Sequence, residues 1–215
     1  MTALRLFFFA LLITSATGST ASLRIGAATA DITPELNVLL DGTIMKIGPA
    51  TEVHDRLHAR CVAFADGRNT IAIAVIDNTM IAREILDEAR HQIHDATGMP
   101  KSHIMLAATH SHSTPRAADI GQGKANEDYH RYMAKQISAG VQQALKNLRP
   151  AKIGWGSFAE PRYVHNRRWF VDPKITPPNP FGEKGDLVWM NPPRGALIKP
   201  AGPVDPEVFI VSAQR

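Results

Sequence analysis

Residues 57–76 read LHARCVAFADGRNTIAIAVI, and this stretch decides the fold class that the sequence predicts. Two apolar runs of strand length, 57–65 and 70–76, flank the polar residues Asp66-Gly67-Arg68-Asn69. Asp-Gly steps favour the tight turns that join antiparallel strands. We therefore expect a β-hairpin here, with other elements packed around it.

Two amphipathic helices are predicted after the hairpin. In the first, apolar residues recur every three or four positions from Ile81 to Ala96, with Asn78 or Thr79 as the N-cap and Gly98 as the C-terminal stop. The second follows Asn126, keeps one apolar face, and ends at Pro150. Both helices have the pattern of elements that cover a sheet.

Further strands are expected at 23–30, 103–108 and 151–156, and from Val208 onward. The alternation of strands and helices predicts an α/β fold, a layered sheet with packed helices. The segment 169–207 holds nine of the 15 prolines, and we expect it to be irregular. A long irregular segment that leads into a final strand favours an incomplete chain over a domain that ends in an edge strand.

Composition excludes several kinds of site. The 215 residues include 24 Lys and Arg against 20 Asp and Glu, a formal net charge of +4 without a run of either sign. Nucleic-acid binding is therefore not indicated. Because Cys61 is the only cysteine, an intramolecular disulfide and a Cys-rich zinc cluster are excluded, and any metal must be held by His, carboxylates or Tyr.

The N-terminus has the pattern of a secretory signal peptide. Arg5 precedes the apolar run 6–13, and small residues continue to Ser22, so we expect a signal over 1–21, cleaved after Ala21. The apolar run is much shorter than the roughly 20 residues of a transmembrane helix. A buried N-terminal helix is the alternative. The expectation is an exported protein, periplasmic or secreted, whose residues 22–215 form one domain and contain no transmembrane segment.

The densest cluster of functional groups is Thr109-His110-Ser111-His112-Ser113-Thr114-Pro115, directly after a predicted strand. In open α/β sheets, binding sites form beyond the carboxyl ends of strands. On a turning loop, His110 and His112 can converge on one ion, and the neighbouring hydroxyls can fix the ring tautomers. The alternative is that both histidines face water or cap the following turn.

A second polar cluster is His165-Asn166-Arg167-Arg168-Trp169. Its fixed positive charge and amide donors suit an anion or a developing oxyanion. An exposed basic loop in which Trp169 is a packing anchor is equally compatible with these residues.

The order of motifs resembles the N-terminal domain of the neutral/alkaline, non-lysosomal ceramidase family. The matching segments run in order from Leu23 to Arg215, and the combination of Thr-His-x-His-Ser with Asp-Ile-Thr-Pro is the most specific part. They are Gly26-Ala27-Ala28-Thr29-Ala30-Asp31-Ile32-Thr33-Pro34, Leu57-His58-Ala59-Arg60, Ala108-Thr109-His110-Ser111-His112-Ser113-Thr114-Pro115, Asn166-Arg167-Arg168 and Val204-Asp205-Pro206-Glu207-Val208.

The resemblance implies a secreted zinc amidase of sphingolipid metabolism, which hydrolyses an N-acyl amide bond in a lipid. By the same resemblance, His110 would be a ligand of Zn2+. His112 would contact the substrate or the tetrahedral intermediate, and Arg167 would add positive charge to that site.

The sequence also departs from the family pattern. Thr114 stands where the family usually has Gly, and Arg116 stands where small residues are common. The family's other zinc ligands, a second His, a Glu and a Tyr, lie downstream of the strand at which this chain ends. For the chain alone we therefore expect weak zinc binding and no hydrolysis. The alternatives are an exported, non-catalytic binding protein with the same fold and a metal-dependent hydrolase of the amidohydrolase type.

Overall fold

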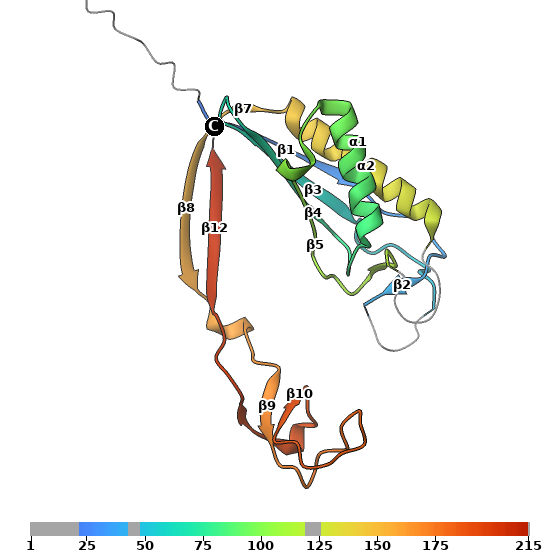
Figure 1. The fold of residues 1–215 in the computed structure, drawn as a ribbon, viewed down its shortest axis with the longest axis vertical. Helices are drawn as coiled ribbons and strands as arrows, with labels where there is room; N and C mark the ends of the chain where they lie inside the picture. The colour runs from blue at the N-terminus through green and yellow to red at the C-terminus, as the bar shows by residue number, and fades with distance from the viewer. Residues whose placement is uncertain (1–21, 43–47, 119–125, 215) are drawn as a thin grey trace, which may run out of the picture. The chain divides into compact units, whose positions relative to one another are not determined.

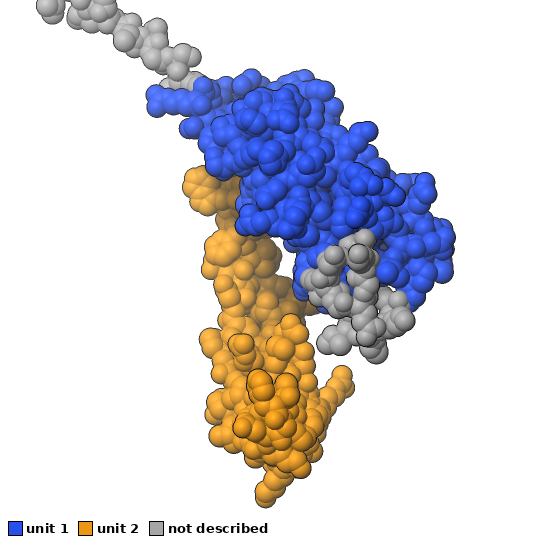
Figure 2. Space-filling model, turned by 45° about the vertical axis from the view of Figure 1, so that its right-hand side comes forward, with its two compact units in different colours: residues 1–152, 215 blue, residues 153–214 orange. Residues whose placement is uncertain are grey.

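The computed structural model describes residues 22–42, 48–118 and 126–214. The expected signal peptide, 1–21, lies outside the described residues. The chain divides into two compact units, unit 1 up to Lys152 and unit 2 from Ile153 to Gln214, shown in different colours in Figure 2. No helix of the described residues is long and apolar enough to span a membrane.

Unit 1 is a mixed sheet with two helices (Figure 1). Its elements are β1 (Arg24–Asp31), β2 (Leu40–Asp41), β3 (His58–Ala65), β4 (Thr70–Ile76), α1 (Arg83–Thr97), the 3-10 turn η1 (Lys101–His103), β5 (Ile104–Ala108), β6 (Thr114–Pro115), α2 (Glu127–Lys146) and β7 (Arg149–Pro150). The main sheet has the order β5-β4-β3-β1-β7, and the short strands β2 and β6 pair separately. The predicted α/β class is confirmed.

The predicted hairpin forms the centre of this sheet. β3 and β4 pair antiparallel from Ala59↔Ile76 to Ala65↔Thr70, with the turn over 66–69. β5 then joins β4 in parallel, so that β4 and β5 end side by side at Ile76 and Ala108. The side chains that follow these two strands are therefore neighbours, as the carboxyl ends of adjacent parallel strands require.

Small residues line the helix-facing side of the sheet. Ala59, Cys61 and Ala63 alternate along β3 as buried residues. At Gly26 in β1, an added Cβ would lie 2.2 Å from the carbonyl oxygen of Ala144 in α2. The close approach of helix and sheet therefore depends on residues without large side chains.

The first helix ends and the second begins as predicted, but the first begins later than predicted and the second ends earlier, at Lys146 before Pro150. Gly98 stops α1 in the left-handed conformation at φ 70°, and Asn126 caps α2 by accepting the backbone N–H groups of Asp128 and Tyr129. The expectation that Asn78 or Thr79 caps α1 is wrong, because α1 starts after Ala82 without a side-chain cap. Both expected caps are buried and bind the loop that follows β5 instead.

Unit 2 consists of short strands and two 3-10 turns. Its elements are β8 (Lys152–Ala159), η2 (Pro161–Tyr163), β9 (Arg168–Val171), β10 (Val188–Met190), η3 (Arg194–Ala196), β11 (Leu197–Pro200) and β12 (Glu207–Gln214). β8 pairs with β12, and β9 lies between β10 and β11 in a three-stranded sheet. The strands expected at 151–156 and from Val208 are confirmed as β8 and β12.

The expectation that 169–207 is irregular is wrong for β9, β10 and β11. The prolines do not interrupt these strands, because they stand in the connections or, as with Pro200, at the last position of an edge strand. Proline is tolerated at these positions, since no ladder hydrogen bond is lost there.

Candidate functional site

The histidine loop, residues 109–113, begins where β5 leaves the sheet. The Thr109 backbone N–H still donates to the carbonyl of Ile76 at 3.0 Å, and the next residue turns sharply. His110 has φ 63°, in the left-handed region that residues other than glycine rarely adopt. Such a conformation costs on the order of 1 kcal/mol and persists only where the surroundings hold it.

The His110 ring is held by the end of the neighbouring strand. Its Nδ1 lies 2.7 Å from the carbonyl oxygen of Thr79, which follows β4. Because a carbonyl oxygen only accepts, Nδ1 carries the proton and donates, and Nε2 keeps its lone pair in the neutral ring. This is the arrangement typical of a metal-ligating histidine, whose second nitrogen donates to a carbonyl or carboxylate.

His112 lies beside His110. The two ring centroids are 4.7 Å apart with an interplanar angle of 83°. Gly42, at φ 98°, packs against His112, and a Cβ added at Gly42 would lie 2.6 Å from the His112 Cα. The turn after β2 therefore positions His112, and the structure brings together both predicted site histidines.

Three hydrogen bonds from Asn78 and Thr79, which follow β4, hold the histidine loop and the strand β6 after it. The Thr79 hydroxyl donates to the carbonyl of Ser111 at 2.6 Å, and the Thr79 backbone N–H donates to the hydroxyl of Thr114 at 3.0 Å. Asn78 donates its side-chain amide to the carbonyl of Pro115 at 3.1 Å. Thr114, which departs from the family pattern, is thus wholly buried in this network.

Asp41 adds a buried carboxylate near this loop. It is 8% exposed and pairs in register with Thr114 across β2 and β6. Its Oδ1 accepts the backbone N–H of Gly42 at 2.8 Å, and its Oδ2 has no hydrogen-bond partner among the described residues. Sequence reasoning missed Asp41, Gly42 and Thr79, because an Asp-Gly step is typical of an ordinary turn and Thr79 has the pattern of a helix cap.

The described residues do not assemble a complete zinc site. His110 fits as one ligand through Nε2. Within residues 22–42, 48–118 and 126–214, however, no group of three or more His, Cys, Asp or Glu side chains is placed to hold a metal ion. A catalytic zinc usually takes three protein ligands.

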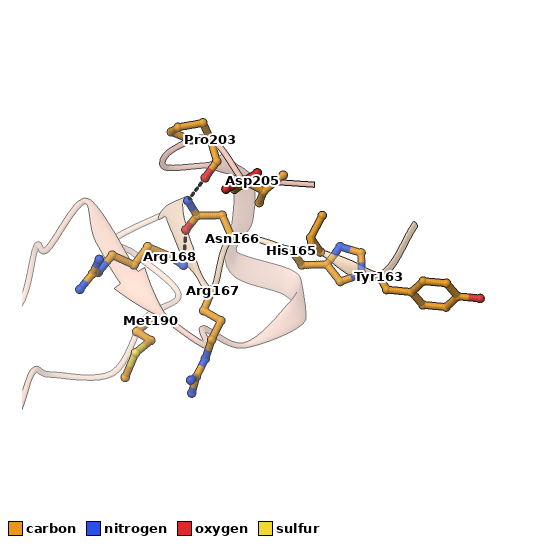
Figure 3. Close-up of a pocket in the computed structure, with 10 residues that line it drawn as sticks. Tyr163, His165, Asn166, Arg167, Arg168, Met190, Pro203 and Asp205 are labelled. Carbon is orange, nitrogen blue, oxygen red and sulfur yellow. Dashed lines mark hydrogen bonds between the residues drawn. The ribbon is translucent and has the colours of Figure 1, made fainter. Parts of the chain in front are cut away.

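Arg167, the third predicted site residue, lies in unit 2. It lines a pocket of about 630 Å3 together with Tyr163, His165, Asn166 and Asp205, among others (Figure 3). Its Nε donates to the Asn191 side-chain oxygen at 3.4 Å, and its guanidinium is exposed. Figure 3 shows the side chains of Arg167 and Arg168 pointing in different directions.

The Asn166 side chain joins two backbone segments that line this pocket. Its side-chain oxygen accepts the Arg168 backbone N–H at 2.9 Å, and its amide donates to the Pro203 carbonyl at 3.0 Å. Trp169 pairs with Trp189 across β9 and β10, and both are partly buried. The cluster therefore combines an exposed basic residue with a packing anchor. The structure brings the two histidines together in unit 1 and places Arg167 in unit 2.

Comparison with solved structures shows where this fold occurs elsewhere. The neutral ceramidase from Pseudomonas aeruginosa is similar over 69% of this chain and 25% of that chain, with a TM-score of 0.57 and 20% sequence identity. A ceramidase complexed with C2 is similar over 76% of this chain and 30% of that chain, with a TM-score of 0.56 and 18% identity. The chain thus spans less than a third of the length of either protein, and at these identities the similarity establishes the fold alone.

No family model matches the sequence, and a search of curated proteins gives no match. In the comparison of structures, the five-stranded mixed sheet with its two helices matches part of the neutral ceramidase structure. This similarity is consistent with the resemblance in the order of motifs.

Proposed function

We propose that this chain carries one part of a zinc-dependent amidase site that hydrolyses an N-acyl amide bond, with a lipid amide as the substrate. The observation that carries the proposal is the strained His110, whose Nδ1 is bound to the Thr79 carbonyl and whose Nε2 is left for a metal. The fold shared with part of neutral ceramidase supports it.

In this proposal His110 holds the ion through Nε2. Zinc, when bound, supplies a water of lowered pKa and polarises the amide carbonyl. His112, whose ring lies against that of His110, donates a hydrogen bond to the substrate or accepts a proton beside it. Arg167, in unit 2, offers an exposed guanidinium, a group whose positive charge suits an anion or a developing oxyanion.

The other zinc ligands would come from outside the described residues. The described part has one matched ligand, and the chain spans 25% and 30% of the two similar structures. We therefore expect the chain alone to bind zinc weakly and to leave N-acyl amides intact. We also propose that the protein is exported, on the basis of the signal-like residues 1–21.

A non-catalytic binding protein of the same fold is the second candidate. The absence of a three-ligand group within the described residues favours it. An amidohydrolase barrel has no such support, since that fold needs eight parallel strands and the main sheet here is largely antiparallel.

Zinc titration of the purified chain tests the proposal, with His110→Ala as the variant and His91→Ala as the matched control. His91 is an exposed imidazole on α1 whose Nδ1 lies near the carbonyl of Asp87. We expect calorimetry to show weak zinc binding that is lost in His110→Ala and kept in His91→Ala. Equal binding by His110→Ala and the unmodified chain would remove His110 from the metal site.

A further inference from the structure

Thr79 directs each of its three polar atoms to the segment 110–114. Its backbone N–H donates to the Thr114 hydroxyl at 3.0 Å, and its own hydroxyl donates to the carbonyl of Ser111 at 2.6 Å. Its carbonyl oxygen lies 2.7 Å from the Nδ1 of His110 and accepts the proton there. A single residue that follows β4 therefore contacts three positions of the segment that carries both site histidines.

The hydroxyl protons of Thr79 and Thr114 both have acceptors. The Thr79 proton goes to the Ser111 carbonyl, which is the nearest acceptor. The Thr114 proton has two acceptors in reach, the Thr79 Oγ1 at 3.0 Å and the Ser111 carbonyl at 3.1 Å. Thr79 and Thr114 are 2% and 0% exposed, so water does not compete for their hydroxyls. The two hydroxyls thus form a buried chain of hydrogen bonds that ends on the Ser111 carbonyl.

His110 is held in its left-handed conformation from both sides. On one side, the Thr109 backbone N–H donates to the carbonyl of Ile76 at 3.0 Å, as in the sheet. On the other side, the Ser111 carbonyl accepts the Thr79 hydroxyl. A φ of 63° outside glycine persists only where the surroundings fix it. The first contact involves backbone alone, whereas the second depends on a hydroxyl that a substitution can remove.

We propose that Thr79 and Thr114 are positioning residues for His110. Their hydroxyl chain fixes the Ser111 carbonyl, and this keeps the His110 Nδ1 at the Thr79 carbonyl and Nε2 unprotonated. Without the chain, Ser111 is free to move, His110 can leave the left-handed region, and its ring exchanges between the two neutral tautomers.

The inference rests on the proposed function, since the metal is the partner that a positioned Nε2 would serve. It goes beyond the family pattern, because Thr114 stands where the family usually has Gly and a glycine has no hydroxyl. This hold on the histidine loop is therefore a property of the chain's own sequence.

The test compares variants that remove a hydroxyl with variants that keep it. Thr79→Val and Thr114→Val replace the hydroxyl by a methyl group, while Thr79→Ser and Thr114→Ser retain it. Thr97→Val is the matched control, because the Thr97 hydroxyl also donates to a backbone carbonyl at 2.6 Å and accepts a backbone N–H, but at the end of α1. Circular dichroism at 222 nm identifies the variants that fold.

Long-range 1H–15N NMR of the zinc-free proteins at pH 8 reports the tautomer of His110. We expect a single Nδ1-protonated form in the unmodified chain, in both Ser variants and in Thr97→Val. Both neutral forms are expected in the two Val variants of the hydroxyl chain, with the larger change in Thr79→Val, which removes the contact to Ser111 directly. If Thr79→Val does not fold, Thr114→Val decides the question.

Zinc titration of the same proteins adds a second readout. We expect about tenfold weaker binding in Thr79→Val and Thr114→Val, at the lower end of the loss typical when the support of a ligating histidine is removed. The Ser variants and Thr97→Val should bind as the unmodified chain does.

A His110 ring that stays protonated on Nδ1 in the folded Val variants of the hydroxyl chain would overturn the proposal. Mixed tautomers in Thr97→Val or in the Ser variants would also overturn it, since the hydroxyls would then not be the cause. Mixed tautomers confined to Thr79→Val and Thr114→Val, with zinc affinity unchanged, would support the positioning role and contradict the metal role of His110. The two proposals therefore fail separately.

Discussion

Units 1 and 2 both contain β-sheet, but only unit 1 builds a hydrophobic core of its own. Every residue of the buried apolar cluster lies in unit 1, in the main sheet, in the two helices or in the connections next to them. In unit 2 the described residues classed as buried are Val171, Thr176 and Ala196. All residues of β8 and β12 are exposed, including Trp155 at 81% and Phe209 at 73%.

The difference shows what a sheet needs in order to be stable. An isolated two-stranded ribbon is marginal in water, whereas several strands with one covered face form a cooperative unit. Unit 1 has that cover in α2, which contacts β1, β3 and β4. We therefore expect the stability of the chain to reside in unit 1, and unit 2 to open at lower free energy.

Alanine in place of one glycine in each unit gives the largest expected difference. In Gly26→Ala the new Cβ would meet the carbonyl oxygen of Ala144 at 2.2 Å and the backbone nitrogen of Leu148 at 2.6 Å. Because the obstructing atoms are backbone, we expect a loss of about 3 kcal/mol in the free energy of unfolding. In Gly154→Ala nothing lies within 4 Å of the new Cβ, and we expect a change within about 0.5 kcal/mol.

Two probes separate the units in a urea titration. Both long helices lie in unit 1, so circular dichroism at 222 nm follows unit 1, while all three tryptophans lie in unit 2 and their fluorescence follows that unit. Gly26→Ala should move the transition followed at 222 nm to lower urea concentration, and Gly154→Ala should move neither transition. Equal shifts from the two variants would show that the close approach of β1 and α2 does not limit stability.

Loss of one carboxylate in each unit gives a smaller effect. The Asp31 side chain accepts the Thr33 backbone N–H at 2.8 Å and lies 2.6 Å from the Arg56 guanidinium. The hydrogen bonds from Thr33 and then the charge of Arg56 lower the pKa of Asp31 from 3.8 to about 2. In unit 2, Asp172 accepts the Lys174 backbone N–H at 2.9 Å, but no ion pair involves it among the described residues.

Because the folded-state pKa of Asp31 is depressed, its stabilisation is present above the unfolded value near 4 and is lost as the pH falls through about 2. We expect Asp31→Asn to lower the stability of unit 1 by about 0.5–1 kcal/mol at pH 7, the size of a partly exposed ion pair, and by much less at pH 2, where about half of the Asp31 side chains are protonated in the folded chain. Asp172→Asn should have little effect at either pH. Thermal melts followed at 222 nm measure the difference, and a gap for Asp31→Asn that is as large at pH 2 as at pH 7 would contradict the ion-pair explanation.

Local patterns were enough to predict most of unit 1. The Asp66-Gly67 turn, the Asn126 cap and the Gly98 stop each act within a few residues, so the sequence specifies them directly. The start of α1 depends on tertiary contacts. Asn78 and Thr79 form hydrogen bonds with residues 32 to 37 positions further along the chain, and their side chains do not cap the helix. The strands of 169–207 were missed because proline counts do not show whether prolines stand within or between strands.

The candidate site was predicted only in its residue types. Nothing local reveals that His110 adopts a left-handed conformation, that the Thr79 carbonyl meets its ring, or that Gly42 packs on His112. These contacts join segments that the sheet order brings together.

The tautomer of His110 tests most directly whether unit 1 holds a ready metal ligand. Long-range 1H–15N NMR of the zinc-free chain at pH 8 distinguishes the two neutral forms of the ring. We expect the proton on Nδ1, bound to the Thr79 carbonyl, and an unprotonated Nε2. A ring protonated on Nε2 would leave no lone pair there for zinc and would contradict the proposed role of His110.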